Sequence, residues 1–233
     1  MSNMKNTKRR KKRGLRYNKK RRAKQRLIIL ILIAVLIALG VIMMTNQVTN
    51  LLWEPDPEIY WEKDAEKIKV ERPELDVQLL TINPYSRPGT PTKRIQNIVV
   101  HYTANPGTTA QQNRDYFEGL KESQITQSSS NFIIGLEGEI IQCIPSAEVA
   151  YASNSANSTS VSIEMCHPDE TGAFTENTYE SAVKLTAYLC DKFDLDEKDI
   201  LRHYDITGKN CPKYFVENED AYNKFLQDVK DMV

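Results

Sequence analysis

The sequence predicts an α/β (α+β) fold in which helices flank a central mixed β-sheet, preceded by one N-terminal transmembrane helix. Two observations support this prediction. An apolar run of 18 residues, 27–44, follows a strongly basic arm. Between residues 94 and 233, short β-branched runs alternate with longer segments whose apolar residues recur at helical spacing. The 233 residues therefore divide into an anchor and one ordinary domain, joined by a linking segment.

The basic arm and the rest of the chain carry opposite charges. Residues 1–26 contain 14 Lys and Arg and neither Asp nor Glu, which leaves 17 basic residues against 31 acidic ones elsewhere. A basic block can bind nucleic acid. Next to an apolar run, however, attraction to anionic lipids and orientation of the anchor explain it better, so no nucleic-acid partner is expected.

Residues 27–44 contain no charged or strongly polar side chain. As a helix they would span roughly 27 Å, close to the ~30 Å hydrocarbon core of a bilayer. The alternative is a cleaved signal peptide, whose apolar region usually has only ~7–15 residues and ends at small side chains. This run ends in Ile42-Met43-Met44, which favours an uncleaved anchor. The basic flank predicts a single-pass protein of the cell membrane, with its N-terminus cytoplasmic and residues 45–233 outside.

Residues 45–93 are predicted to form an extracytoplasmic spacer. They are rich in proline and charge and show little sustained periodicity. The membrane interface, where aromatic side chains are favoured, suits Trp53, Tyr60 and Trp61, but solvent exposure or packing against protein suits them equally. The segment 75–82 is predicted to form a short strand or an arm against the domain.

The domain expected at residues 94–233 contains strand and helix patterns in alternation. Segments with strand-like composition are 97–102, 131–136, 139–143 and 160–165. Segments with apolar residues at helical spacing are 109–120, 178–193 and 218–233. Thr109 and Gln112 form a capping-box pattern at a helix start, and Glu137-Gly138 predicts a hairpin turn.

Two histidines and a cysteine are candidate metal ligands. His101 lies near the end of the 97–102 strand, while His203 and Cys211 are expected in one loop because Gly208 and Pro212 break regular structure. Three such ligands plus a water make a catalytic zinc site. Taken alone, the pattern leaves other roles open, because strand histidines are often packed and no common zinc-finger spacing matches. His167 is predicted to be a loop residue outside the site.

Four segments, in this order, resemble the zinc-dependent N-acetylmuramoyl-L-alanine amidases, the type 2 amidase family that includes the peptidoglycan recognition proteins. The resemblance covers roughly residues 95–230. The matching segments are IVVHYT (98–103), NFIIGLEGEIIQ (131–142), SVSIE (160–164) and HYDITGKNCP (203–212).

The resemblance implies particular roles for individual residues. His101, His203 and Cys211 match the family's three Zn²⁺ ligands. Lys209 matches a lysine that many members place beside the metal, and Glu164 matches an acidic residue that handles protons in some members. The chain departs from the family at Ser130-Asn131, where many members carry a histidine.

The expected function is that of a membrane-anchored zinc hydrolase that cleaves the amide between N-acetylmuramic acid and L-alanine in peptidoglycan. The family members that only bind peptidoglycan often lack the cysteine ligand, so Cys211 favours catalysis. Two alternatives are a non-catalytic peptidoglycan-binding receptor and a zinc peptidase that cuts within the stem peptide. No sequence feature argues for an oligomer, so a monomer is expected. A disulfide between Cys143 and Cys166 stays open at this point.

Overall fold

The computed structural model of the chain describes Gly40 and residues 59–233. The basic arm, the rest of the predicted anchor and the first part of the predicted spacer lie outside the described residues. Within the described part of the chain, no helix combines the length and the apolar composition needed to cross a membrane.

A mixed β-sheet forms the centre of the domain. Its strands follow the order β1-β4-β3-β5-β2-β6. They are β1 (Asp76–Val77), β2 (Asn97–Tyr102), β3 (Phe132–Ile134), β4 (Ile140–Gln142), β5 (Ser160–Met165) and β6 (Ile200–Arg202). Strands β3 and β4 pair antiparallel, and the other neighbours run parallel. The predicted mixed sheet is therefore confirmed.

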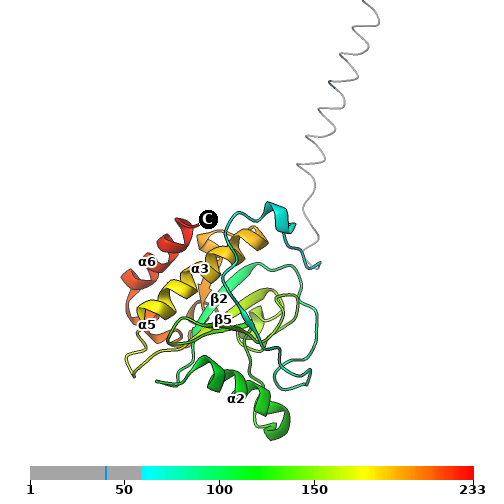
Figure 1. Ribbon diagram of the computed structural model, residues 1–233, viewed down its shortest axis with the longest axis vertical. Helices are drawn as coiled ribbons and strands as arrows, with labels where there is room; N and C mark the ends of the chain where they lie inside the picture. Colours follow the sequence, from blue (N-terminus) through cyan, green and yellow to red (C-terminus); the bar gives the residue numbers. More distant parts are fainter. Residues whose placement is uncertain (1–39, 41–58) are drawn as a thin grey trace, which may run out of the picture. The chain divides into compact units, whose positions relative to one another are not determined.

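Helices cover both faces of this sheet, as the sequence predicts. Helix α2 (Ala110–Ser123) lies on one side, and helices α3 (Glu176–Phe193) and α6 (Glu219–Lys230) lie on the other (Figure 1). The short helices α4 (His203–Thr207) and α5 (Lys213–Glu217) connect β6 to α6. Single 3-10 turns occur at Ala65–Lys67, Asn154–Ala156 and Glu197–Asp199.

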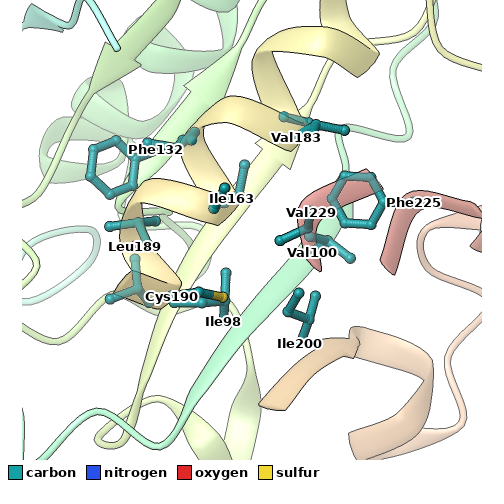
Figure 2. Close-up of a cluster of buried hydrophobic side chains, with 14 of the residues drawn as sticks. Ile98, Val100, Phe132, Ile163, Val183, Leu189, Cys190, Ile200, Phe225 and Val229 are labelled. Atoms are coloured by element: carbon teal, nitrogen blue, oxygen red, sulfur yellow. The ribbon is translucent and has the colours of Figure 1, made fainter. Parts of the chain in front are cut away.

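The larger hydrophobic core lies between the sheet and helices α3 and α6. Val100 of β2 and Ile163 of β5 pack there with Leu189 of α3 and Phe225 of α6 (Figure 2). Successive strand residues point to opposite faces, so the residue after each of these strand positions points toward α2. A smaller apolar cluster, which includes Phe117 of α2, fills that second face.

The capping-box and turn signals in the sequence correspond to a helix start and a hairpin turn in the structure. The Thr109 side chain accepts a hydrogen bond from the Gln112 amide, and the Gln112 side chain accepts one from the Thr109 amide, which completes the capping box. Gly138 adopts a φ of 86° in the β3–β4 turn, a left-handed conformation that glycine accepts without steric cost. The predicted hairpin is thus confirmed.

Residues 60–93, predicted to belong to the spacer, pack against the domain. The Tyr60 ring lies 6.0 Å from the Phe193 ring, and the Lys63 amide donates a 2.8 Å hydrogen bond to the Lys192 carbonyl. The Arg94 guanidinium lies 5.8 Å from the ring centre of Trp61. The packed part of the chain therefore begins well before residue 94.

The four cysteines are free and buried. The disulfide that the sequence left open between Cys143 and Cys166 is absent, and both side chains instead belong to the apolar cluster beneath α2. Burial raises the pKa of each of these two thiols to about 12. Such thiols are poor nucleophiles at neutral pH, since the thiolate is the reactive form.

Candidate functional site

The carboxyl ends of three neighbouring parallel strands meet at one edge of the sheet. His101 of β2 and Glu164 of β5 are directly opposite each other in the register, so their side chains lie on the same face, toward α2. His203 follows the end of β6 as the first residue of α4. The sheet therefore brings three site residues together from distant parts of the sequence.

Helix α4 and the turn after it bring Cys211 to the same place. The Asp205 carboxylate accepts from the Arg202 amide at 2.8 Å and pairs with its guanidinium, which fixes the helix start. Gly208 ends the helix in a left-handed conformation. The Tyr204 amide then donates to the Cys211 carbonyl at 2.9 Å. The prediction of one loop over 203–211 was wrong for its first half, because Asp205 stabilises a helix there.

The three predicted metal ligands converge. One ligand atom from each of His101, His203 and Cys211 lies within 4.8 Å of the other two. The Cys211 sulfur lies 3.8 Å from Nδ1 of His101, and the two imidazole ring centres are 4.7 Å apart. The set of two imidazoles and one thiol suits zinc, which prefers nitrogen and sulfur ligands.

The hydrogen bonds of the two rings show which nitrogens would face a metal. Nε2 of His101 lies 3.1 Å from the Ser153 hydroxyl, and Nε2 of His203 lies 2.9 Å from the Asn154 side-chain oxygen. Nδ1 of His203 is buried and has no hydrogen-bond partner among the described residues. A buried polar atom without a partner is costly, so the site fits a metal ligated through Nδ1.

Burial controls the protonation of the ligands. It lowers the pKa of His101 well below its usual value, with His203 and Lys209 adding to the effect, and it lowers the pKa of His203, with Lys209 adding. Both rings are therefore neutral near pH 7, as metal ligation requires. Burial raises the pKa of Cys211 to about 12, with Glu164 adding to the shift. A metal bound at this site would have to displace the thiol proton.

The catalytic candidates flank the ligands in a cavity of about 380 Å³. Glu164 and Lys209 line it together with the three ligands. Burial raises the pKa of Glu164 to about 8, although Lys209 opposes the shift, and one carboxylate oxygen is buried without a partner among the described residues. Lys209 itself is exposed. All five site residues predicted from the sequence therefore share one cavity.

Asn131, the departure from the family pattern, does not line this cavity. It is fully buried, and its side-chain oxygen accepts from the amide and hydroxyl of Ser162 at 3.0 Å each. Its side-chain nitrogen donates to the carbonyls of Pro145 and Glu148. The departure therefore concerns a buried brace between β3, β5 and the loop after β4.

His167 lies near the candidate ligands but is not one of them. Its Nδ1 lies 2.7 Å from the Asp169 carbonyl, and its ring lies against Tyr102. This agrees with the predicted loop position.

Sequence reasoning missed Ser153 and Asn154, since a polar loop carries no periodic signal and their contacts appear only in three dimensions.

Comparison with known proteins places the chain in a family. A sequence model described as N-acetylmuramoyl-L-alanine amidase matches residues 91–214, more than half of the chain. The chain belongs to this family. Every predicted site residue lies within the matched range.

Individual members of the amidase family show the extent of the likeness. N-acetylmuramoyl-L-alanine amidase CwlL of Bacillus licheniformis is 34% identical over 164 residues, and the amidase BlyA of Bacillus subtilis (strain 168) is 36% identical over 172. Each alignment covers 65% of this chain and 45% of the relative. The chain thus spans about half the length of these curated relatives.

The fold also matches that of a solved structure. PlyL superposes with a TM-score of 0.58 at 22% sequence identity, over 67% of this chain and 97% of PlyL. At this identity the likeness concerns the fold, which the two chains share.

Proposed function

We propose that the chain is a membrane-anchored zinc hydrolase that cleaves the amide between N-acetylmuramic acid and L-alanine in peptidoglycan. The observation that carries the proposal is the convergence of His101, His203 and Cys211 within 4.8 Å. They line a cavity together with Glu164 and Lys209. Membership of the amidase family supports the choice of substrate.

The three ligands would hold Zn²⁺ through Nδ1 of each imidazole and the thiolate sulfur. Bound there, zinc would supply a water of lowered pKa and a Lewis acid that polarises a carbonyl. The neutral state of His101 and His203 keeps their lone pairs available for this ligation.

Glu164 would take the proton from the attacking water and return it to the leaving amine. Without metal, burial raises its pKa to about 8; the positive charge of a bound zinc would lower that pKa and favour the carboxylate that accepts the proton. Lys209 would stabilise the negative charge that develops on the carbonyl oxygen, because it lines the same cavity and its charge acts on Glu164 and His203. The two residues thus divide proton transfer and charge stabilisation between them.

The direct test incubates the detergent-solubilised full chain with purified peptidoglycan and identifies the products by mass spectrometry. Chelator-sensitive release of peptides that begin at L-alanine is the expected result. Internal peptide ends would instead show a zinc peptidase. Binding to the wall without any release would show a receptor.

Glu164→Gln tests the proton-transfer role. We expect turnover to fall by about 10²–10⁴-fold, the usual contribution of general acid–base catalysis, while zinc content stays unchanged. Lys209→Met should reduce turnover by roughly 10²–10³-fold through loss of charge stabilisation. Full turnover in either variant would remove that residue from its role.

We further propose a single membrane anchor at residues 27–44, with the N-terminus cytoplasmic and the amidase domain outside. The apolar run and its basic flank support this arrangement. Fractionation of cells expressing a C-terminally tagged chain provides the test. The tag should remain with the membrane and be accessible to protease from outside, whereas release of the tagged domain into the medium would show a cleaved signal peptide.

A further inference from the structure

One loop supports both histidines of the candidate metal centre. Nε2 of His101 contacts the hydroxyl of Ser153 at 3.1 Å, and Nε2 of His203 contacts the side-chain oxygen of Asn154 at 2.9 Å. The two supporting residues are adjacent in sequence, whereas the two histidines come from β2 and α4. This loop is therefore placed to set the orientation of both rings together.

We propose that Ser153 and Asn154 are positioning residues, which hold the two histidines in the tautomer and orientation that present Nδ1 to zinc. The inference rests on the proposed function. A neutral imidazole has one N–H and one lone pair. An amide oxygen can only accept a hydrogen bond, so Asn154 requires the proton of His203 on Nε2. The lone pair is then left on Nδ1, which is buried and meets no hydrogen-bond partner in the described part of the chain.

Ser153 plays the corresponding part for His101. A hydroxyl can donate or accept, so it can accept from an Nε2–H of His101 when Nδ1 ligates a metal. Its side chain is completely buried, and water cannot easily replace it there. Nδ1 of His101 is the atom that lies 3.8 Å from the Cys211 sulfur, which places the free lone pair of this ring beside the third ligand.

The loop is itself held in place. The Asn157 side-chain oxygen accepts from the amides of Ala152 and Ser153 at 3.2 and 2.6 Å. On the other side, the Tyr151 amide donates to the Ser129 hydroxyl at 2.9 Å, and the Ser129 amide donates to the Tyr151 carbonyl at 3.1 Å. These contacts fix the backbone up to Ser153 and so position the residues that touch the two histidines.

The backbone conformation of Asn154 determines which substitutions at this position test the proposal. Its φ is 52°, a left-handed conformation that glycine adopts freely and that asparagine and aspartate tolerate better than most residues. Asn154→Gly therefore keeps the backbone and removes the acceptor, whereas Asn154→Asp keeps both. Aspartate would also form the carboxylate–histidine–metal arrangement that is common around zinc.

The experiment measures zinc affinity in the metal-free full chain by competition with a chromophoric chelator. Loss of such supporting partners typically weakens metal binding by about 10–100-fold, and we expect this for Asn154→Gly and for Ser153→Ala. Asn154→Asp should bind zinc at least as tightly as the unchanged chain. Ser155→Ala is the matched control, since Ser155 is exposed in the same turn and should leave the affinity unchanged. Melting of the metal-free variants, followed by circular dichroism, establishes that each is folded.

The outcomes separate this inference from the proposed function. Unchanged zinc affinity in both Asn154→Gly and Ser153→Ala would overturn the positioning role, and so would equal weakening by Asn154→Gly and Asn154→Asp. If the unchanged chain binds no zinc, both proposals fail. If it binds zinc with the expected variant pattern but releases no peptide from peptidoglycan, the amidase proposal fails and the positioning role stands.

Discussion

Asp191→Asn should loosen the attachment of residues 60–93 to the domain. Asp191 lies on α3 and is only 4% exposed. One of its oxygens accepts from the backbone amides of Lys69 and Val70 at 2.5 and 2.9 Å, and the other accepts from the Lys63 ammonium at 3.0 Å. A single carboxylate thus holds three groups of a segment that precedes it by more than a hundred residues.

The expected cost follows from these three hydrogen bonds. A hydrogen bond to a charged group contributes ~1.5–3 kcal/mol, against ~1 kcal/mol for a neutral pair. The side-chain amide introduced by the substitution could still accept from the two backbone amides, but with neutral strength, and its NH₂ group would face the Lys63 ammonium. We therefore expect the free energy of unfolding to fall by about 3 kcal/mol. For a domain of this size the melting temperature should fall by roughly 6–12 °C.

Thermal unfolding of the full chain, followed by circular dichroism, measures this loss. Asp194→Asn is the matched control, because Asp194 pairs with the same Lys63 at 3.1 Å but is 62% exposed. Exposed ion pairs contribute ~0–1 kcal/mol, and asparagine tolerates the left-handed backbone at this position (φ 58°). Equal melting temperatures for the two variants would refute the importance of the buried carboxylate.

The loss of stability caused by Asp191→Asn should depend on pH. Burial alone would raise the pKa of Asp191, but hydrogen bonds from Val70, Lys63 and Lys69 outweigh it and lower the pKa below 3.8. Because the folded-state pKa is the lower one, the carboxylate stabilises the fold above about pH 3.8, and this stabilisation is lost as the pH falls through the folded-state value. The difference between the unchanged chain and Asp191→Asn should therefore shrink in acid; a difference that grows would contradict the assignment.

Two further substitutions and one labelling experiment test other parts of the structure. Asn131→Ala should lower the free energy of unfolding by about 3 kcal/mol in urea, because it leaves buried groups unpaired; a loss below about 1 kcal/mol would contradict its role as a brace. Gly138→Ala should cost about 2 kcal/mol, since the φ is 86° and the new Cβ would lie 2.9 Å from the Asn177 carbonyl oxygen; an unchanged melting temperature would argue against this turn. Cys143 and Cys166 should resist thiol reagents near neutral pH until the chain unfolds, and rapid labelling of the folded protein would show that they are not buried.

The elements that depend on neighbouring residues could be predicted from the sequence. The β-branched run at 97–102 forms β2, and the reciprocal bonds of Thr109 and Gln112 start α2. Gly138 lies in the turn between β3 and β4. In each case the signal and the structure that it predicts lie within a few residues of each other, so no information about the rest of the fold is needed.

The site could be predicted only in part, because its contacts join distant segments. Residue type alone made His101, His203 and Cys211 candidate ligands but left other roles open, and the resemblance to the amidase family predicted that they act together. It could not show that Asn131 lies in a brace away from the cavity. Nor could it show that Ser153 lies behind a histidine, since the loop has no pattern that distinguishes it from other polar loops.

One face of the sheet packs the hydrophobic core, and the other face carries the candidate site. This separation follows from the alternation of side chains along each strand. Val100 points into the core beneath α3, whereas the next residue, His101, points into the cavity beside α2. Ile163 and Glu164 of β5 repeat this pair in register. A one-residue shift of β2 would turn His101 into the apolar core, and the same shift of β5 would bury Glu164 there. The strand register that packs the core therefore also places Glu164 beside the candidate metal ligands.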